Sequence, residues 1–61
     1  MIQVHSIDDA IEKISQCTDR EQVKQIVDEV DRRFINAELV VDGDGWAGLS
    51  KAVALWIHQN G

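Results

Sequence analysis

The chain has 61 residues, a formal net charge of −5 and a single cysteine, which together exclude several classes of protein. Its length fits one small domain covering residues 1–61, because domains usually run to about 100–150 residues. A disulfide scaffold needs paired cysteines, and 44% hydrophobic residues argue against disorder. The longest apolar run, 52–57, is too short for a membrane span, and the N-terminal residues lack a secretory pattern. We therefore expect a cytoplasmic protein with no membrane partner.

The N-terminal part predicts a short extended segment followed by a helix. Residues 1–5 alternate around Ile2 and Val4, which is typical of a brief strand or an extended arm. Ser6 fits the N-cap position, because Asp9 follows three residues later and can satisfy a free backbone N–H. Apolar side chains then recur at helical spacing and predict a helix over about residues 7–16: Ile7, Ala10, Ile11, Ile14 and Cys17.

A second helix is predicted over about residues 19–36. Thr18 and Glu21 form a capping box, which places the start of this helix directly after a turn around Cys17 and Thr18. Two capped starts so close together favour a helix hairpin over one long helix. Apolar residues expected on the core side of the second helix are Val23, Ile26, Val27, Val30, Phe34 and Ala37.

The apolar period changes after Ala37. Leu39–Val41 is a short β-branched run that predicts a strand, able to pair with Ile2–Val4. In the loop Asp42–Gly45, the glycines are expected to hold a positive φ and the aspartates to cap the last helix. That helix should begin between Gly45 and Gly48 and reach His58 or Gln59.

These elements predict a mainly α fold. It is a small three-helix domain, a helix hairpin plus a C-terminal helix, with a short N-terminal strand or arm. In the last helix the apolar side chains expected on one face are Leu49, Ala52, Val53, Trp56 and Ile57.

No residue pattern points to metal, cofactor or catalytic chemistry. Aligning the Asp42–Gly45 loop with a calcium-binding EF-hand leaves Val40 and Lys51 where oxygen ligands belong. Cys17, His5 and His58 lack the local spacing of a zinc site. Because Cys17 follows the C-terminal end of a helix, nothing lowers the pKa of its thiol toward that of a nucleophile. We therefore expect a protein that is not an enzyme.

Nucleic-acid binding is the main alternative that the sequence leaves open. A helix hairpin can be the helix-turn-helix of a small DNA-binding transcriptional regulator, in which helix 19–36 would carry Arg20, Lys24, Arg32 and Arg33 to DNA. Five acidic residues share that helix, and phosphate binding needs a cationic surface. A field of carboxylates can also mimic nucleic acid. The acidic residues considered for such mimicry are Asp8, Asp9, Glu12, Asp28, Asp31 and Glu38.

Protein binding is the function that the sequence favours most. Tryptophan is enriched at binding hot spots, and Trp46 stands among glycines beside a loop. A three-helix core of this size also leaves apolar side chains in need of cover, which predicts a homodimer or a docking surface. The expectation is an acidic adaptor or modulator of a larger protein, whose working surface is the apolar part of the last helix together with Trp46, rimmed by acidic residues. Its expected partner-binding residues are Trp46, Leu55, Val40, Leu39, Ile2 and Val4.

Overall fold

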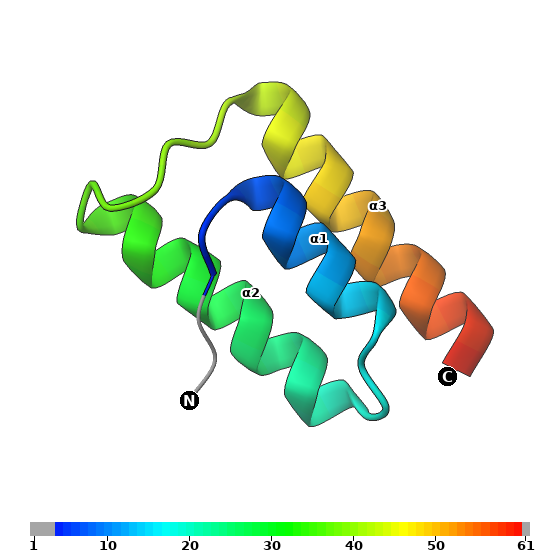
Figure 1. Cartoon of the computed structure of the whole chain (residues 1–61). Coiled ribbons are helices and arrows are strands. Elements are labelled where there is room, and N and C mark those ends of the chain that lie inside the picture. The colour runs from blue at the N-terminus through cyan, green and yellow to red at the C-terminus, as the bar shows by residue number, and fades with distance from the viewer. Residues whose placement is uncertain (1–3, 61) are drawn as a thin grey trace.

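The computed structural model describes residues 4–60, and within this range it contains three α-helices and no strand (Figure 1). The helices are α1 (Ile7–Ser15), α2 (Arg20–Ile35) and α3 (Gly43–Asn60). The mainly α, three-helix prediction is therefore confirmed. The expected strand at Leu39–Val41 is wrong, because this segment is an unpaired part of the α2–α3 connection. Of the expected N-terminal strand, residues 1–3, which include Ile2, lie outside the described residues.

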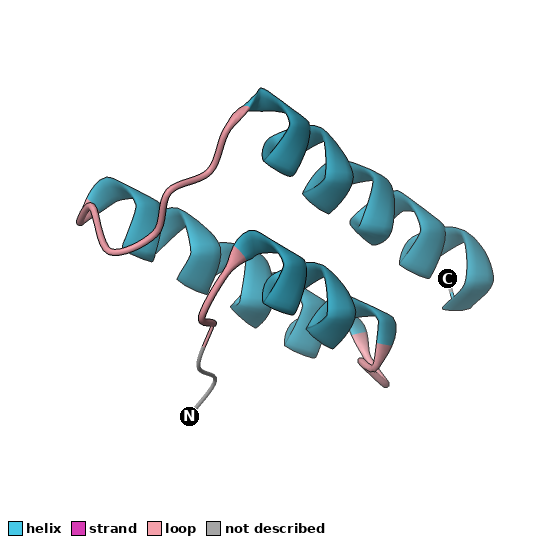
Figure 2. Cartoon of the chain, turned by 45° about the horizontal axis from the view of Figure 1, so that its top comes forward, coloured by secondary structure: helices cyan, strands magenta, loops and turns pink. Residues whose placement is uncertain are grey.

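Helix α1 packs against both of the other helices, whereas the backbones of α2 and α3 approach each other closely at few points. Figures 1 and 2 show α1 alongside both of its neighbours, with α2 and α3 running in opposite directions. The core therefore gathers around α1, whose Ala10 and Ile14 are fully buried. The other buried apolar residues are Val4, Val23, Ile26, Val30, Leu39, Val41, Leu49 and Trp56.

The starts of α1 and α2 are both capped, and the second cap differs from the prediction. Ser6 Oγ accepts the backbone N–H of Asp9 at 3.1 Å, as expected. At α2 the cap is Asp19, whose Oδ1 accepts the N–H of Gln22 at 2.9 Å, and Thr18 lies one residue before it. Gln22 Oε1 in turn accepts the N–H of Thr18 at 2.8 Å. The hairpin is confirmed, but the N-cap of its second helix is Asp19 and not Thr18.

Helix α2 ends in a left-handed residue that is not glycine. Ala37 has a φ of 60°, in the region where a Cβ is strained. The N–H of Glu38 donates to the carbonyl of Arg33 at 2.8 Å, and that of Ala37 donates to Phe34 at 3.1 Å. This pair of bonds is a Schellman motif, which satisfies the last carbonyls of the helix. The chain leaves it with Leu39 directed into the core.

Helix α3 begins at Gly43, earlier than the sequence predicted. Asp42 Oδ1 accepts the N–H of Gly45 at 2.7 Å, which confirms an aspartate cap. None of the glycines among the described residues has a positive φ, so that expectation for Gly43 and Gly45 is wrong. The cap at Asp42 draws both glycines into the first turn, and the left-handed residue is Ala37 instead.

Trp56 ties the end of α3 to the hairpin turn. Its side chain is 5% exposed, and its indole Nε1 donates to the carbonyl oxygen of Cys17 at 3.0 Å. The bond joins residues far apart in the sequence and satisfies the one polar atom of a buried ring. It therefore anchors α3 against α1 at the end opposite the α2–α3 connection.

Candidate functional site

An apolar groove lies between α2 and α3, where these two helices make little contact. Its cavity volume is about 480 Å³. One lining residue comes from α2 and the rest from α3: Val27, Trp46, Leu49, Ser50, Val53, Ala54 and Ile57. The Ser50 hydroxyl and the Trp46 indole N–H are the only polar side-chain groups among them, and none of these residues is ionisable. The groove thus offers apolar surface and no acid, base or ligand for a metal.

The spacing of residues along α3 explains why the groove is apolar. Trp46, Val53 and Ile57 are seven and four residues apart, so they follow one side of the helix. Ala52 and Trp56 lie on a neighbouring strip that packs toward α1. The apolar arc of α3 is therefore wider than α1 can cover. Part of the face that the sequence assigned to the core lines the groove instead.

Phe34 and Trp46 close one end of the groove. Their ring centroids are 5.2 Å apart with an interplanar angle of 81°, an edge-to-face contact between α2 and α3. Phe34 is nevertheless 42% exposed, which corrects its expected place in the hairpin core. Ile57, toward the other end, is 40% exposed. We name the surface formed by Val27, Phe34, Trp46, Val53 and Ile57 the groove face.

Of the predicted partner-binding residues, only Trp46 lies on the groove face. It is half-buried, as expected for a ring that both covers the core and meets solvent. Leu55 is nine residues further along α3, which places it half a turn away, on the opposite side of the helix. The single surface that the sequence predicted is therefore divided between two sides of α3.

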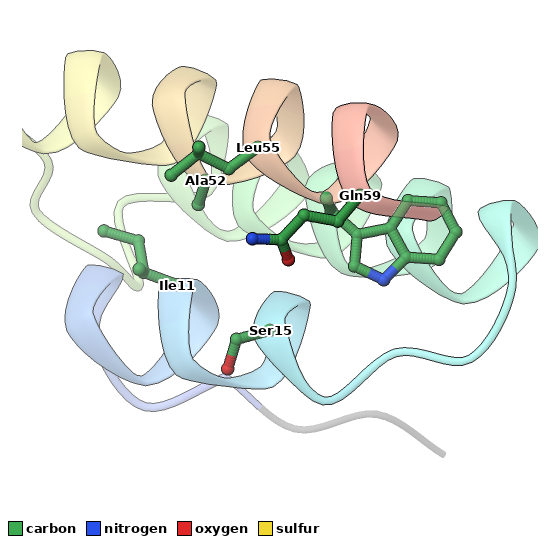
Figure 3. A pocket seen from close by; sticks show the side chains of 6 residues that line it. Ile11, Ser15, Ala52, Leu55 and Gln59 are labelled. Atoms are coloured by element: carbon green, nitrogen blue, oxygen red, sulfur yellow. The ribbon is translucent and has the colours of Figure 1, made fainter. Parts of the chain in front are cut away.

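Leu55 borders a smaller pocket between α1 and α3 (Figure 3). Its volume is about 280 Å³, and its lining residues are Ile11, Ser15, Ala52, Leu55, Trp56 and Gln59. Ser15 Oγ already donates to the carbonyl of Glu12 at 2.6 Å, so its hydroxyl proton is engaged and no base activates it as a nucleophile. This pocket is a notch beside the core and holds no cluster of reactive groups.

The α2–α3 connection and the N-terminal arm supply much less surface than predicted. Val4 is 1% exposed and Leu39 is 7% exposed, so both belong to the core and their assignment as partner-binding residues is corrected. Both insert beside buried helix residues, which an isolated sequence pattern cannot show. Val40 is 92% exposed between two buried neighbours, and Ile2 lies outside the described residues. The predicted partner-binding residues did not include Val27, Val53 or Ile57; the predicted working surface took in the apolar part of the last helix, to which Val53 and Ile57 belong, whereas the spacing of Val27 had placed it in the core.

Ion pairs occupy the basic residues at the end of α2. Glu29 accepts from Arg32 and Arg33, with nitrogen–oxygen distances of 2.7 and 2.9 Å. The hydrogen bonds from Arg33 and then Arg32 hold the pKa of the Glu29 carboxyl below its usual range. On α1, hydrogen bonds from Lys13 and from the His5 backbone lower the pKa of Asp9 in the same way. Two arginines considered for DNA contact are thus bound within their own helix.

The surroundings of the Cys17 thiol keep it protonated, as in a structural cysteine. Burial raises its pKa, and the charge of Asp19 adds to the rise. Its Sγ lies 3.3 Å from the carbonyl oxygen of Lys13, to which the thiol donates. Among residues 4–60, no three His, Cys, Asp or Glu side chains gather as metal ligands. None of the helices in this range combines the length and the apolar character that a membrane span requires.

No protein-family model matches the chain, no curated protein matches its sequence, and no solved structure matches its fold.

Proposed function

We propose that this chain is a non-enzymatic, acidic adaptor or modulator that binds a larger cytoplasmic protein through the groove face. The observation that carries the proposal is the apolar groove of about 480 Å³ whose rims keep Phe34 and Ile57 about 40% exposed. Apolar patches on small monomers mark interaction sites, and aromatic side chains dominate binding energy at such sites.

The shape and chemistry of the groove favour a protein over other ligands. A small-molecule site surrounds its ligand and adds a few convergent polar groups, whereas this groove is open and offers only the Ser50 hydroxyl and the Trp46 indole N–H. Phosphate binding needs cations, and no lining residue is charged. An apolar strip with aromatic residues at one end suits the side chains of a helix lying along it. Such a helix can come from another protein or from a second copy of this chain.

The test uses two matched variants of α3. Ile57→Asp places a charge on the groove face, and Leu55→Asp places the same charge on the opposite side of the helix. The two positions are 40% and 50% exposed, so both variants should stay folded, which circular dichroism checks. The immobilised chain and each variant are exposed to cytosol, and the retained proteins are identified.

A protein retained by the original chain and by Leu55→Asp but lost with Ile57→Asp supports the proposal. Equal retention by both variants overturns it. Duplex DNA serves as the second probe. Binding of duplex DNA that falls steeply with salt would favour the transcriptional regulator instead, because release of counterions drives such binding.

A further inference from the structure

One side of α2 carries a strip of residues whose charged members make no ion pair within the described part of the chain. Its members are Arg20, Lys24, Val27, Asp31 and Phe34, spaced four and three residues apart along one side of the helix. Val27 lines the groove and Phe34 meets Trp46, so this strip borders the groove face. Basic residues occupy its first half and an acidic residue its second half. Within the described residues, Arg20, Lys24 and Asp31 form no ion pair.

The order of charges on this strip is the reverse of what stabilises a single helix. Acidic side chains are favourable near a helix N-terminus and basic ones near its C-terminus. Elsewhere α2 follows this rule, with Glu21 in its first turn and Arg32 and Arg33 in its last. Arg20 opposes the rule in the first turn of the same helix. The stability of α2 therefore does not explain the order of charges along the strip. An antiparallel neighbour with the same strip does explain it, because the basic half of each strip then faces the acidic half of the other.

We propose that a second copy of this chain covers the groove face, related by a twofold axis that passes near Val27 and Val53. The inference rests on the proposed function in that the groove face binds protein, and it names the occupant. Twofold pairing is the commonest assembly of small domains and requires a surface that complements itself. A second copy and an outside partner would then compete for one face.

The axis brings opposite charges together on α2. A twofold axis perpendicular to the helix sets α2 antiparallel to the partner's α2. Lys24 is three residues before Val27 and Asp31 is four after it, which is about 4.5 and 6 Å along the helix at 1.5 Å per residue. Lys24 therefore faces the partner's Asp31, and the same pair forms again on the other side of the axis.

The same axis suits α3. The contact between Phe34 and Trp46 fixes how the two antiparallel helices align. Counting seven residues back from Phe34 reaches Val27, and counting seven forward from Trp46 reaches Val53. These two residues lie level with each other in the groove. Because Ile57 is four residues beyond Val53, the partner's Ile57 falls on the Trp46 side of the groove.

The available area also suits a second copy. A stable interface buries about 800 Å² on each partner, about a fifth of the 4303 Å² accessible surface of this chain. The groove between α2 and α3 is the larger of the two hollows, with a volume of about 480 Å³ against about 280 Å³ for the pocket beside Leu55. The dimer would place Val27 and Val53 at its axis and the charged pairs beside them on α2.

The test combines sedimentation equilibrium with an exchange of charges. At tens of micromolar and low salt, the original chain should have a mass near twice 6.9 kDa. Lys24→Asp and Asp31→Lys should each raise the dimer dissociation constant about tenfold or more, because each sets like charges opposite one another. The double variant carrying both changes should recover the original dissociation constant. Lys51→Asp makes the same charge change at an exposed position off the groove face and should leave dimerisation unchanged.

Three outcomes overturn the second-copy inference. They are a monomer at the highest soluble concentration, a double variant as weak as its parents, and equal weakening by Lys51→Asp. Circular dichroism of each variant shows whether it is folded, and all three charged positions are exposed. A monomer that loses a captured protein through Ile57→Asp keeps the proposed function and overturns only the dimer. If the charge exchange confirms the dimer but Ile57→Asp does not reduce protein capture, the second-copy inference stands and only the proposed function is overturned.

Discussion

The two sides of α3 differ in what covers them. Toward α1, Trp56 is 5% exposed and its indole is bonded to Cys17. Toward the groove, Ile57, the very next residue, is 40% exposed. Helix α1 has 9 residues and α3 has 18, so their lengths are about 13.5 and 27 Å at 1.5 Å per residue. Helix α1 packs against one side of α3 only, so apolar side chains on another side of α3 line the groove instead of the core.

The two tryptophans should show the largest contrast. Trp56→Ala should lower the free energy of unfolding by about 3–5 kcal/mol, because it opens a cavity in the core. That loss is comparable to the whole stability of so small a domain. Trp46→Ala should cost clearly less, because the Trp46 ring is half-buried. Urea denaturation followed by circular dichroism measures both, and equal losses would mean that the groove side is as essential to the core as the α1 side.

Packing density should separate the same two sides of α3. A Cβ at Gly48 would lie 3.2 Å from Cδ1 of Ile11, so α1 and α3 approach closely there. Gly48→Leu should therefore destabilise the chain by about 1–3 kcal/mol through overpacking. Ala47→Leu, at the adjacent exposed position, is the matched control and should be nearly neutral. Thermal unfolding of both variants measures the difference, and a neutral Gly48→Leu would show that the α1 side is loosely packed.

The start of α2 sharpens the comparison, because α2 is one wall of the groove. Asp19→Ala should cost about 1 kcal/mol, since Asp19 Oδ1 caps the N–H of Gln22. Thr18→Ala should cost less, because the Thr18 hydroxyl bonds only the Gln22 side chain, at 3.2 Å. Chemical denaturation of both variants tests the order. A larger loss for Thr18→Ala would restore the cap that the sequence first suggested.

The end of α2 should yield a gain in stability. Ala37→Gly relieves a left-handed alanine and should raise the free energy of unfolding by about 0.5–1 kcal/mol. The Schellman bonds to Arg33 and Phe34 do not involve the alanine side chain, so they are retained. Thermal denaturation measures the change. A loss of stability would mean that the Ala37 methyl group makes a contact that outweighs the strain.

Acid should weaken the fold slightly while leaving the groove face unchanged. The pKa values of Asp9 and Glu29 are lowered in the folded chain, so the unfolded chain takes up these protons first as pH falls. Their contribution is fully present above the unfolded carboxyl pKa of about 4 and is lost as the pH falls from there through the lowered pKa of each group in the folded chain. Denaturation midpoints of Asp9→Asn and Glu29→Gln between neutral and acid pH test this. Both variants should flatten the decline, and an unchanged slope would contradict the assignment.

Local patterns in the sequence determined the helices of this protein. The hairpin, its turn, the Ser6 cap and the approximate ends of α1 and α2 follow from helical spacing and from short side chains that bond nearby N–H groups. These interactions join residues within about four positions of one another, so the sequence displays them directly. The class of small three-helix domain follows in turn.

Tertiary structure alone decided which apolar residues are covered. The sequence shows a wide arc of apolar residues on α3. Because α1 packs against one side of α3 and the contact between α2 and α3 is limited, Trp56 is buried in the core and Ile57 remains at the surface. The same long-range packing buries Val4 and Leu39 and leaves Phe34 exposed. Helical periodicity gives the direction of a side chain but not its neighbour, and burial depends on the neighbour.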